Sequence, residues 1–252
     1  MGLNDVSVLI PASADEAAAA FGDGSGVTVV AGGTIVLPEL AAGRLRPKTA
    51  LLLGRAGLAG IERKDGRVTI GAGTPVSALH DADRPLADAA RHVGDLEVRA
   101  QATVGGNVCS ASSDDAPRGD LQAALLALGA DVRSTGKGGE ATEPLERFLA
   151  DGAGAGRLVL DVSYDDAPRQ AGYAAVWRPH SHHYTILAVA AAKRDGELRL
   201  AATGVAPRAV LLDAGDPLRG LELRDDALAS AWYRTQLLPR LVERALANLQ
   251  EA

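Results

Sequence analysis

Short hydrophobic runs alternate with helix-type segments along the first hundred residues. Apolar stretches at 6–13 and 48–55, and the β-branched run Val27–Val30, predict strands because such residues favour extended chain. The alanine-rich segment that begins at Ser13 predicts a helix with that serine as N-cap and Glu16 in the capping-box position. These alternations indicate a small α/β unit at the start of the chain.

The next segments add a hairpin and two helices. Residues 59–73 predict a β-hairpin turning at Asp65–Gly66, the dipeptide typical of a two-residue turn. Residues 85–94 predict a helix, and another helix begins with Asp120 as N-cap and stops at Gly129. The stretch between these helices is rich in small side chains.

That stretch, residues 99–115, follows neither a helical nor a strand period and predicts a loop. Residues 130–150 predict a strand, a polar turn and a short helix, and the glycine-rich 151–156 predicts a loop before a strand at 157–164. A loop made of small side chains allows another group to lie against its backbone.

Residues 165–170 are the best candidate for a domain boundary. Beyond them, 171–177 and 183–206 predict a three-stranded antiparallel meander that turns at Asp195–Gly196. A helical tail follows, in which Pro239 is expected at the first position of a second helix. The pattern therefore predicts an α+β protein with a larger N-terminal and a smaller C-terminal part.

Composition narrows the class of protein. The 252 residues carry a formal net charge of −6, which provides no field for nucleic acid. A single cysteine, Cys109, excludes an intrachain disulfide and any iron–sulfur cluster or thiolate zinc site held by this chain alone. The beginning of the sequence lacks a signal-peptide pattern, and no apolar stretch has the length of a membrane span. We therefore expect a cytoplasmic protein without a membrane span.

Two glycine segments are candidates for anion binding. The first ends the strand at Val30, and the second lies within the predicted loop. Consecutive small residues let backbone N–H groups converge on an anion such as phosphate. Either pair alone would favour a tight turn, but two such segments shift the balance toward binding. A third segment, Gly71–Gly73, is assigned a structural role first. The two candidate segments comprise Ala31, Gly32, Gly33 and Thr34, and Thr103, Gly105, Gly106 and Asn107.

The common nucleotide-binding and metal-binding patterns are absent or weak. There is no G-x-x-x-x-G-K-[ST] sequence, and residues 22–26 precede a strand instead of following one, which disfavours a Rossmann site. His180 and His182 would share one strand face, but no nearby ligand completes a metal set. Asp114–Asp115 is interpreted as a solvated loop, because adjacent side chains point apart. We predict neither a metal site nor a catalytic residue in this chain.

The glycine segments carry a family resemblance. "VVAGGT", followed by "QATVGGNVCSASSDDAPRGDLQAALLALGADV", closely resembles the FAD-binding medium subunit of molybdenum hydroxylases, the carbon monoxide dehydrogenase and xanthine dehydrogenase family. "RPLADAARHVGDLEVRAQATVGGN", "GVAP" at 204–207 and "AWYRTQLLPRLVERAL" extend the similarity over nearly the whole chain. The resemblance implies an FAD-binding domain of the PCMH/vanillyl-alcohol-oxidase type at 1–166, with subdomains at approximately 1–52 and 53–166, and a small C-terminal α+β domain at 167–252.

The resemblance also implies roles for individual residues. FAD would lie between the two subdomains, with its pyrophosphate accepting backbone hydrogen bonds from both glycine segments. Asp120 would bind ribityl or ribose hydroxyls, a role compatible with capping a helix. Ser110 and Ser112 would reach phosphate or ribose, or equally cap local turns. Cys109 is expected to be a small buried hydrophobic residue in preference to a reactive thiol.

Near the isoalloxazine ring the chain departs from the family. Tyr173 matches the aromatic residue that approaches the ring in relatives, but Ala174 or Ala175 stands where those proteins have a lysine. Stabilisation of the reduced flavin would then be weaker, or would come from Trp177 or Arg178.

Three functions remain open from the sequence. The leading hypothesis is an oxidoreductase subunit that takes electrons from [2Fe–2S] clusters of a small partner subunit and passes them from FAD to an external acceptor. A large partner subunit would hold the molybdenum cofactor, giving a heterotrimer that can itself dimerise. The alternatives are a self-contained FAD-dependent oxidase or reductase of a small molecule, and a scaffold that has lost its flavin.

Overall fold

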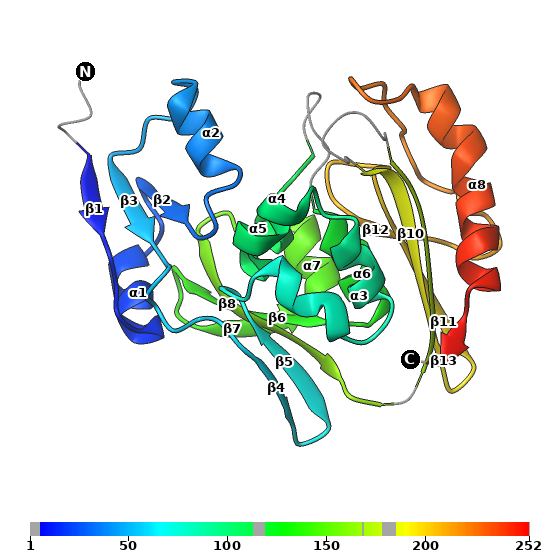
Figure 1. The fold of residues 1–252 in the computed structure, drawn as a ribbon, viewed down its shortest axis with the longest axis horizontal. Helices are drawn as coiled ribbons and strands as arrows, with labels where there is room; N and C mark the ends of the chain where they lie inside the picture. The colour runs from blue at the N-terminus through cyan, green and yellow to red at the C-terminus, as the bar shows by residue number, and fades with distance from the viewer. Residues whose placement is uncertain (1–5, 113–118, 168, 178–184, 252) are drawn as a thin grey trace.

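The computed structural model describes residues 6–112, 119–167, 169–177 and 185–251. Three β-sheets follow one another along the long axis of the molecule, with a group of helices between the second and the third (Figure 1). The mixed α+β class predicted from the sequence is confirmed.

The first sheet is parallel and has the strand order β1-β3-β2. Its predicted strands are confirmed as β1 (Ser7–Leu9), β2 (Val27–Val30) and β3 (Thr49–Leu52), with α1 (Ala14–Phe21) and α2 (Val36–Ala41) in the connections. Ser13 caps α1 by accepting from the Glu16 N–H at 3.1 Å. The Glu16 carboxylate accepts from the Ala12 N–H at 2.7 Å, one residue earlier than the capping box predicts.

The second sheet is antiparallel, with the order β4-β5-β8-β6-β7. The hairpin prediction is confirmed, since Asp65 and Gly66 have φ values of 51° and 74° between β4 and β5. Strand β7 was not predicted, because its residues are polar and mostly exposed. The strands are β4 (Ile61–Lys64), β5 (Arg67–Gly71), β6 (Asp131–Gly136), β7 (Ala141–Pro144) and β8 (Arg157–Asp165).

A group of short helices covers this second sheet. They are the 3₁₀ helix η2 (Val76–Asp81), α3 (Leu86–Arg91), α4 (Leu96–Gln101), α5 (Val104–Cys109), α6 (Asp120–Ala127) and α7 (Leu145–Ala150). The predicted loop at 99–115 is therefore wrong over α4 and α5. Each of these two helices has six residues and starts at a capping side chain, Asp95 or Thr103, and so few residues show no period.

Helix α6 is central, because every residue from Leu121 to Ala127 is buried. The prediction that Asp120 caps it is wrong. Gly119, with φ 84°, is the N-cap residue and has no side chain, so a neighbouring helix supplies the cap. The Asn107 Oδ1 accepts a hydrogen bond from the Leu121 N–H at 3.0 Å.

The third sheet has five strands, not the three predicted, in the antiparallel order β12-β11-β10-β9-β13. The meander is β9 (Gln170–Trp177), β10 (Thr185–Arg194) and β11 (Glu197–Thr203), and the edges are the two-residue β12 (Val210–Leu211) and β13 (Gln250–Glu251). Pro239 lies inside a single helix, α8 (Ala231–Ala247), and not at the start of a second one. Strands β12 and β13, with two residues each, are too short to show a sequence period. A proline that lies inside a helix cannot be distinguished by pattern from one that begins a helix.

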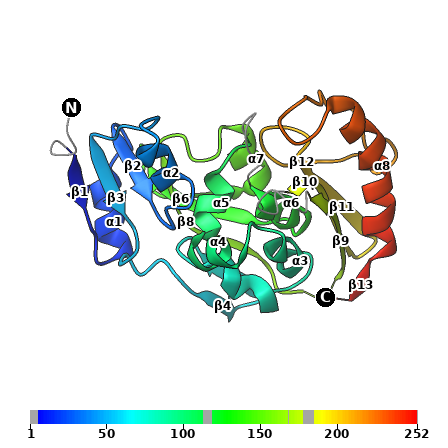
Figure 2. The ribbon, with the colours of Figure 1, turned by 45° about the horizontal axis from the view of Figure 1, so that its top comes forward.

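Strand β10 separates two layers of helix packing (Figure 2). Ala188, Ala190 and Ala192 face α6, whereas Leu187 and Val189 face α8, as alternation along a strand requires. Small side chains on the α6 side let the helix lie close to the sheet. The third sheet is therefore fixed against the helix group that borders the candidate site.

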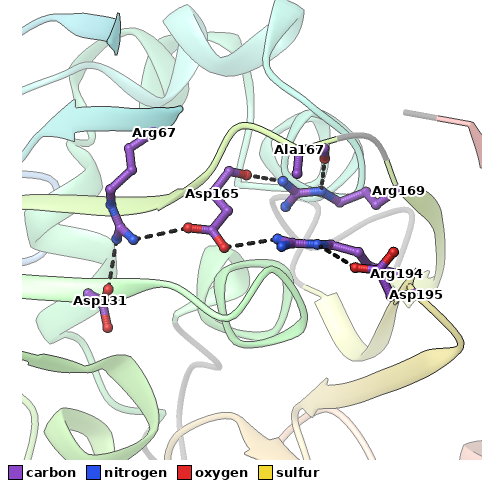
Figure 3. A network of polar contacts seen from close by, with 7 residues as sticks. All are labelled: Arg67, Asp131, Asp165, Ala167, Arg169, Arg194 and Asp195. Carbon is purple, nitrogen blue, oxygen red and sulfur yellow. Dashed lines mark hydrogen bonds and ion pairs between the residues drawn. The ribbon is translucent and has the colours of Figure 1, made fainter. Parts of the chain in front are cut away.

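Asp165 joins the second and third sheets at their polar edge (Figure 3). Its carboxylate binds Arg67 of β5 at 3.1 Å and Arg194 of β10 at 2.9 Å. Arg169 donates to the backbone oxygens of Asp165 and Ala167 and lies over the Tyr164 ring. These contacts at the predicted boundary hold the two sheets in one orientation.

Gln122 connects α6 to two other segments from a fully buried position. Its Nε2 donates to the carbonyl oxygens of Val108 at 3.0 Å and Ser110 at 2.8 Å, with a third, longer bond to that of Asn107. Its Oε1 accepts from the Ala209 N–H at 3.0 Å. One buried side chain thus pairs with backbone groups of α5, of Ser110 and of Ala209.

Replacing this amide is expected to destabilise the fold strongly. Gln122→Leu should lower the free energy of unfolding by about 3 kcal/mol or more, because each unpaired buried polar group costs about 1–3 kcal/mol. Urea unfolding measures the change. Gln236→Leu, on an exposed position of α8, is the matched control and should change stability by less than about 0.5 kcal/mol. Equal losses in both variants would contradict this assignment.

Candidate cofactor-binding cleft

A cleft of about 640 Å³ lies between the first sheet and the helix group. This volume is within the range of about 300–1,000 Å³ typical of ligand and cofactor sites. Ten of the twelve candidate binding residues line it, from segments far apart in the sequence. These ten are Ala31, Gly32, Gly33, Thr34, Thr103, Gly105, Gly106, Asn107, Ser110 and Asp120.

The first glycine segment leaves β2 and offers unpaired backbone donors. The N–H groups of Gly32, Gly33 and Thr34 donate to no acceptor among the residues that the structure describes. Gly33 has φ 73°, a conformation that disfavours other residues. Unpaired neighbouring N–H groups on a cleft wall are suited to binding an anion.

Gly32 also lies in direct contact with the second segment. A Cβ at this position would be 1.9 Å from the Gln101 carbonyl oxygen and 3.0 Å from the Ala102 Cα. Both are backbone atoms at the junction of α4 and α5, so they cannot move aside as a flexible side chain can. The missing side chain of Gly32 therefore allows the two walls of the cleft to meet.

The second glycine segment forms the first turn of α5, and most of its donors are already paired. The Gly105 N–H donates to the Ala72 carbonyl at 2.8 Å, the Gly106 N–H to Thr103 Oγ1 at 3.2 Å, and the Asn107 N–H to the Thr103 carbonyl at 2.9 Å. These three N–H groups are thus already paired within the chain, whereas the family resemblance implied that they would donate to the pyrophosphate of the cofactor. Gly106 is exposed to the cleft and provides close access to its backbone.

The third glycine segment has the structural role assigned to it. A Cβ at Gly71 would lie 2.3 Å from the Leu58 carbonyl oxygen, and one at Gly73 would lie 3.1 Å from the Leu58 carbonyl carbon. Ala72, between these two glycines, contacts Gly105. A Cβ at Gly105 would lie 2.7 Å from the Ala72 Cβ. This segment supports α5 from behind.

Asn107 and the serines differ in how they meet the cleft. The Asn107 Oδ1 is occupied by the cap of α6, while its Nδ2 donates to no acceptor among the described residues. Ser110 lines the cleft, and its hydroxyl donates to the Asn107 carbonyl at 2.7 Å. Ser112 does not line it, and its N–H donates to the Pro207 carbonyl at 2.7 Å.

Asp120 is the first residue of α6, and it is an acidic residue that lines the cleft. Burial raises the pKa of its carboxyl to about 6, and the nearby Thr185 hydroxyl offsets part of that rise. A carboxylate that lines a cleft and is poorly solvated gains from a ligand hydroxyl that donates to it. This arrangement suits recognition of a polyhydroxylated group.

Tyr173 of β9 lies outside the cleft lining and is buried in the hydrophobic core to which α6 also contributes. Its ring is tilted against His92, with the ring centroids 5.3 Å apart, and His92 in turn meets the half-exposed Trp177 at 5.0 Å. Ala174 faces α8 and Ala175 faces α6. Arg178, His180, His182 and the Asp114–Asp115 pair fall outside the described residues.

Cys109 lies on the cleft wall and packs against the hydrophobic core. A Cβ at Gly154 would be 3.0 Å from its Sγ. Burial raises the pKa of its thiol to about 12, so it remains protonated at neutral pH. This agrees with its interpretation as a small hydrophobic residue.

Several lining residues were missed by sequence reasoning. Asp95, which caps α4, and Val98 form one wall, while Gly154 and Gly156 form another. The glycine-rich run at 151–156 was visible as a loop, but no local pattern relates it to the other two segments. Arg157, next to it, uses its guanidinium to bind Ser134 Oγ at 3.1 Å.

Among the described residues, no helix is long and apolar enough to cross a membrane. Within the same residues, no group of three or more histidine, cysteine or acidic side chains is arranged to bind a metal ion.

The family model for the FAD-binding domain in molybdopterin dehydrogenase matches residues 4–163, the part of the chain that forms the cleft. The chain belongs to this family. It is therefore an FAD-binding flavoprotein component of an oxidoreductase, and FAD is its cofactor. No curated protein sequence matches the chain significantly.

Solved structures share the fold over almost the entire length. A chain of carbon monoxide dehydrogenase from Hydrogenophaga pseudoflava is 24% identical with a TM-score of 0.84, covering 98% of each chain. One of quinoline 2-oxidoreductase from Pseudomonas putida 86 is 21% identical with a TM-score of 0.79, covering 98% of this chain and 97% of that one. One of carbon monoxide dehydrogenase from Oligotropha carboxidovorans is 22% identical with a TM-score of 0.81, covering 98% and 100%.

A methyl group at Gly32 should separate the two walls of the cleft. Gly32→Ala is expected to lower the free energy of unfolding by about 1–3 kcal/mol, the usual cost of overpacking, and to weaken FAD binding. Urea unfolding and titration with FAD measure both effects. The control is Gly54→Ala, whose Cβ would meet nothing within 4 Å. Unchanged stability and affinity in Gly32→Ala would contradict the close contact.

The raised pKa of Asp120 has a measurable consequence for stability. An unfolded aspartate has a pKa of about 3.9, so between about pH 4 and pH 6 the folded chain keeps a proton that the unfolded chain has released. Stability from this group is present below about pH 4 and is lost as the pH rises to about 6. Asp120→Asn should therefore gain stability relative to the parent across that interval, measured by urea unfolding from pH 4 to 7.5. A pH-independent difference would be evidence against the shift.

Proposed function

We propose that this chain is the FAD-binding electron-transfer subunit of a molybdenum-containing hydroxylase or dehydrogenase. Its FAD would take electrons from [2Fe–2S] clusters of a small partner subunit and pass them to an external acceptor. A large partner subunit would hold the molybdenum cofactor. The observation that supports this most is the cleft between two glycine segments, within the part of the chain that matches the family.

The cleft fits FAD on physical grounds. The N–H groups of Gly32, Gly33 and Thr34 have no described acceptor, which is the condition for donating to the cofactor's pyrophosphate. The opposite wall would contribute the open backbone surface at Gly106 and the Asn107 Nδ2. Asp120 would accept from ribityl or ribose hydroxyls, and Ser110 would face the same region.

The residues of the cleft would bind FAD and orient it. Bound FAD supplies a centre that accepts and releases electrons. The protein would hold it through backbone donors on one wall and the Asp120 carboxylate at the inner end, while Val98 and the glycines of 154–156 would exclude water. No residue of this chain is proposed to transfer a proton to a substrate.

The division of the chain follows the three sheets. We propose an FAD-binding domain at 1–166, with subdomains at approximately 1–52 and 53–166, and a C-terminal domain at 167–252. Strand β8 supplies Leu158 and Leu160 to the core of the first subdomain, so the two subdomains would form one structural unit. Asp165 would anchor the C-terminal domain at its start.

The partner subunits are inferred from the neighbours and the chemistry. The similar structures are chains of carbon monoxide dehydrogenase and quinoline 2-oxidoreductase. A [2Fe–2S] cluster needs several thiolate ligands, and this sequence has one cysteine, so any clusters would belong to a partner. We therefore propose a heterotrimer of this chain, the small [2Fe–2S] subunit and the large molybdenum subunit.

A charge placed in the cleft should abolish flavin binding without unfolding the chain. A Cβ at Gly106 meets only the Thr103 Oγ1, at 3.0 Å, and the position is exposed, so Gly106→Glu adds a carboxylate opposite the pyrophosphate at little cost to folding. The parent chain with added FAD should show oxidised-flavin absorption after gel filtration, and Gly106→Glu should not. Gly54→Glu, outside the cleft lining, should retain it. A folded parent that stays colourless with excess FAD would favour the scaffold alternative.

A further inference from the structure

The α7–β8 loop (residues 151–156) contributes to the wall of the cleft, although it is built from glycine, alanine and one aspartate. Gly154 and Gly156 line the cleft. Both of them, together with Gly152 and Ala153, have positive φ values, between 45° and 102°. Because glycine has many conformations within reach, the conformation that lines the cleft depends on contacts from outside the loop.

Helix α7 fixes the start of this loop through backbone N–H groups. The Gly152 N–H donates to the Leu149 carbonyl at 3.3 Å and the Ala153 N–H to the Phe148 carbonyl at 2.8 Å, the pair of bonds that commonly ends a helix at a glycine. The carbonyl oxygen of Gly152 takes no part in these bonds. Arg208 donates to it, with its Nη2 at 3.0 Å from the oxygen.

Arg208 is carried by a backbone segment that is itself bonded on both sides. It lies between β11 and β12, where the Pro207 carbonyl accepts from the Ser112 N–H at 2.7 Å and the Ala209 N–H donates to Gln122 Oε1 at 3.0 Å. Three consecutive residues thus contact the segment after α5, helix α6 and the α7–β8 loop. The base of the arginine side chain is therefore fixed against the elements that surround the cleft.

The bond at Gly152 is close to the cleft surface. Arg208 does not itself line the cleft, whereas Gly154, two residues along the chain from the bonded carbonyl, does. Gly154 also packs against Cys109, another lining residue, since a Cβ at Gly154 would be 3.0 Å from the Cys109 Sγ. A change of backbone conformation at Gly152 would therefore alter the cleft wall.

We propose that Arg208 is a positioning residue for the cleft. Its bond to the Gly152 carbonyl holds the α7–β8 loop in the conformation in which Gly154 and Gly156 line the cleft. The third sheet, which lies outside the part of the chain matched by the family model, thereby helps to shape the cofactor site. The effect on FAD rests on the proposed function, whereas the hold on the loop does not.

Amide hydrogen exchange, resolved by residue, tests the hold on the loop in the chain without FAD. Arg208→Met keeps most of the aliphatic stem and removes the donor. The N–H groups of Ala153 and Arg157, which bond to carbonyls of α7 and of the loop, should then exchange about tenfold faster or more, because the loop has lost a bond from a charged donor. The Gly105 N–H, bonded to the Ala72 carbonyl, should keep its rate.

The local exchange rates decide the test, and the overall stability does not. The Arg208 Nε is buried without a partner among the described residues, so removing it offsets part of the stability lost with the bond to Gly152. Equal acceleration at Gly105 would indicate general loosening of the fold and would contradict a local role.

The matched control is Arg199→Met. Arg199 belongs to β11 of the same sheet, and its Nε donates to the Leu126 carbonyl at 3.2 Å, with neither residue lining the cleft. This variant should leave exchange in the α7–β8 loop at the parent rate. Unchanged loop exchange in Arg208→Met, or an equal acceleration in both variants, would overturn the proposal.

Titration of the same three proteins with FAD separates this proposal from the proposed function. Because FAD would bind chains in which the loop is in place, Arg208→Met should raise the Kd about threefold or more, and Arg199→Met should leave it unchanged. Faster loop exchange with an unchanged Kd would contradict positioning of the cleft. If the parent binds no FAD while loop exchange still rises in Arg208→Met, the proposed function fails and the hold of Arg208 on the loop stands.

Discussion

The cleft depends on a contact between backbones at Gly32. Its Cα lies so close to the Gln101 carbonyl that any side chain would separate the first sheet from the helix group. The same pattern recurs at Gly105 against Ala72 and at Gly71 against Leu58. Three glycine positions therefore bring separate segments into contact, and the cleft lies beside the contacts of Gly32 and Gly105.

The two walls of the cleft have different chemistry. Residues 32–34 keep their backbone donors unpaired, whereas those of Gly105, Gly106 and Asn107 are committed to capping and supporting α5. The first wall is thus suited to binding an anion, and the second is a rigid surface held by Asn107 and Gln122. Asp120, the first residue of α6, also lines the cleft.

The sequence predicted the parts of the fold that have a clear local period. Strands β2 and β3 and the Asp65–Gly66 hairpin are local patterns, and all three were predicted correctly. The short helices α4 and α5 were missed because their caps and tertiary contacts, and not a period, define them. The family resemblance selected ten residues that line the cleft, but no pattern in the sequence could relate 151–156 to them.

Amide hydrogen exchange, resolved by residue, tests the central claim most directly. Without FAD, the N–H groups of Gly32, Gly33 and Thr34 should exchange fast, whereas that of Gly105 should already be protected by its bond to Ala72. Adding FAD should slow exchange at the first three positions and change Gly105 little. Unchanged exchange at Gly32–Thr34 in the complex, with new protection at Gly105 and Gly106 instead, would contradict the account.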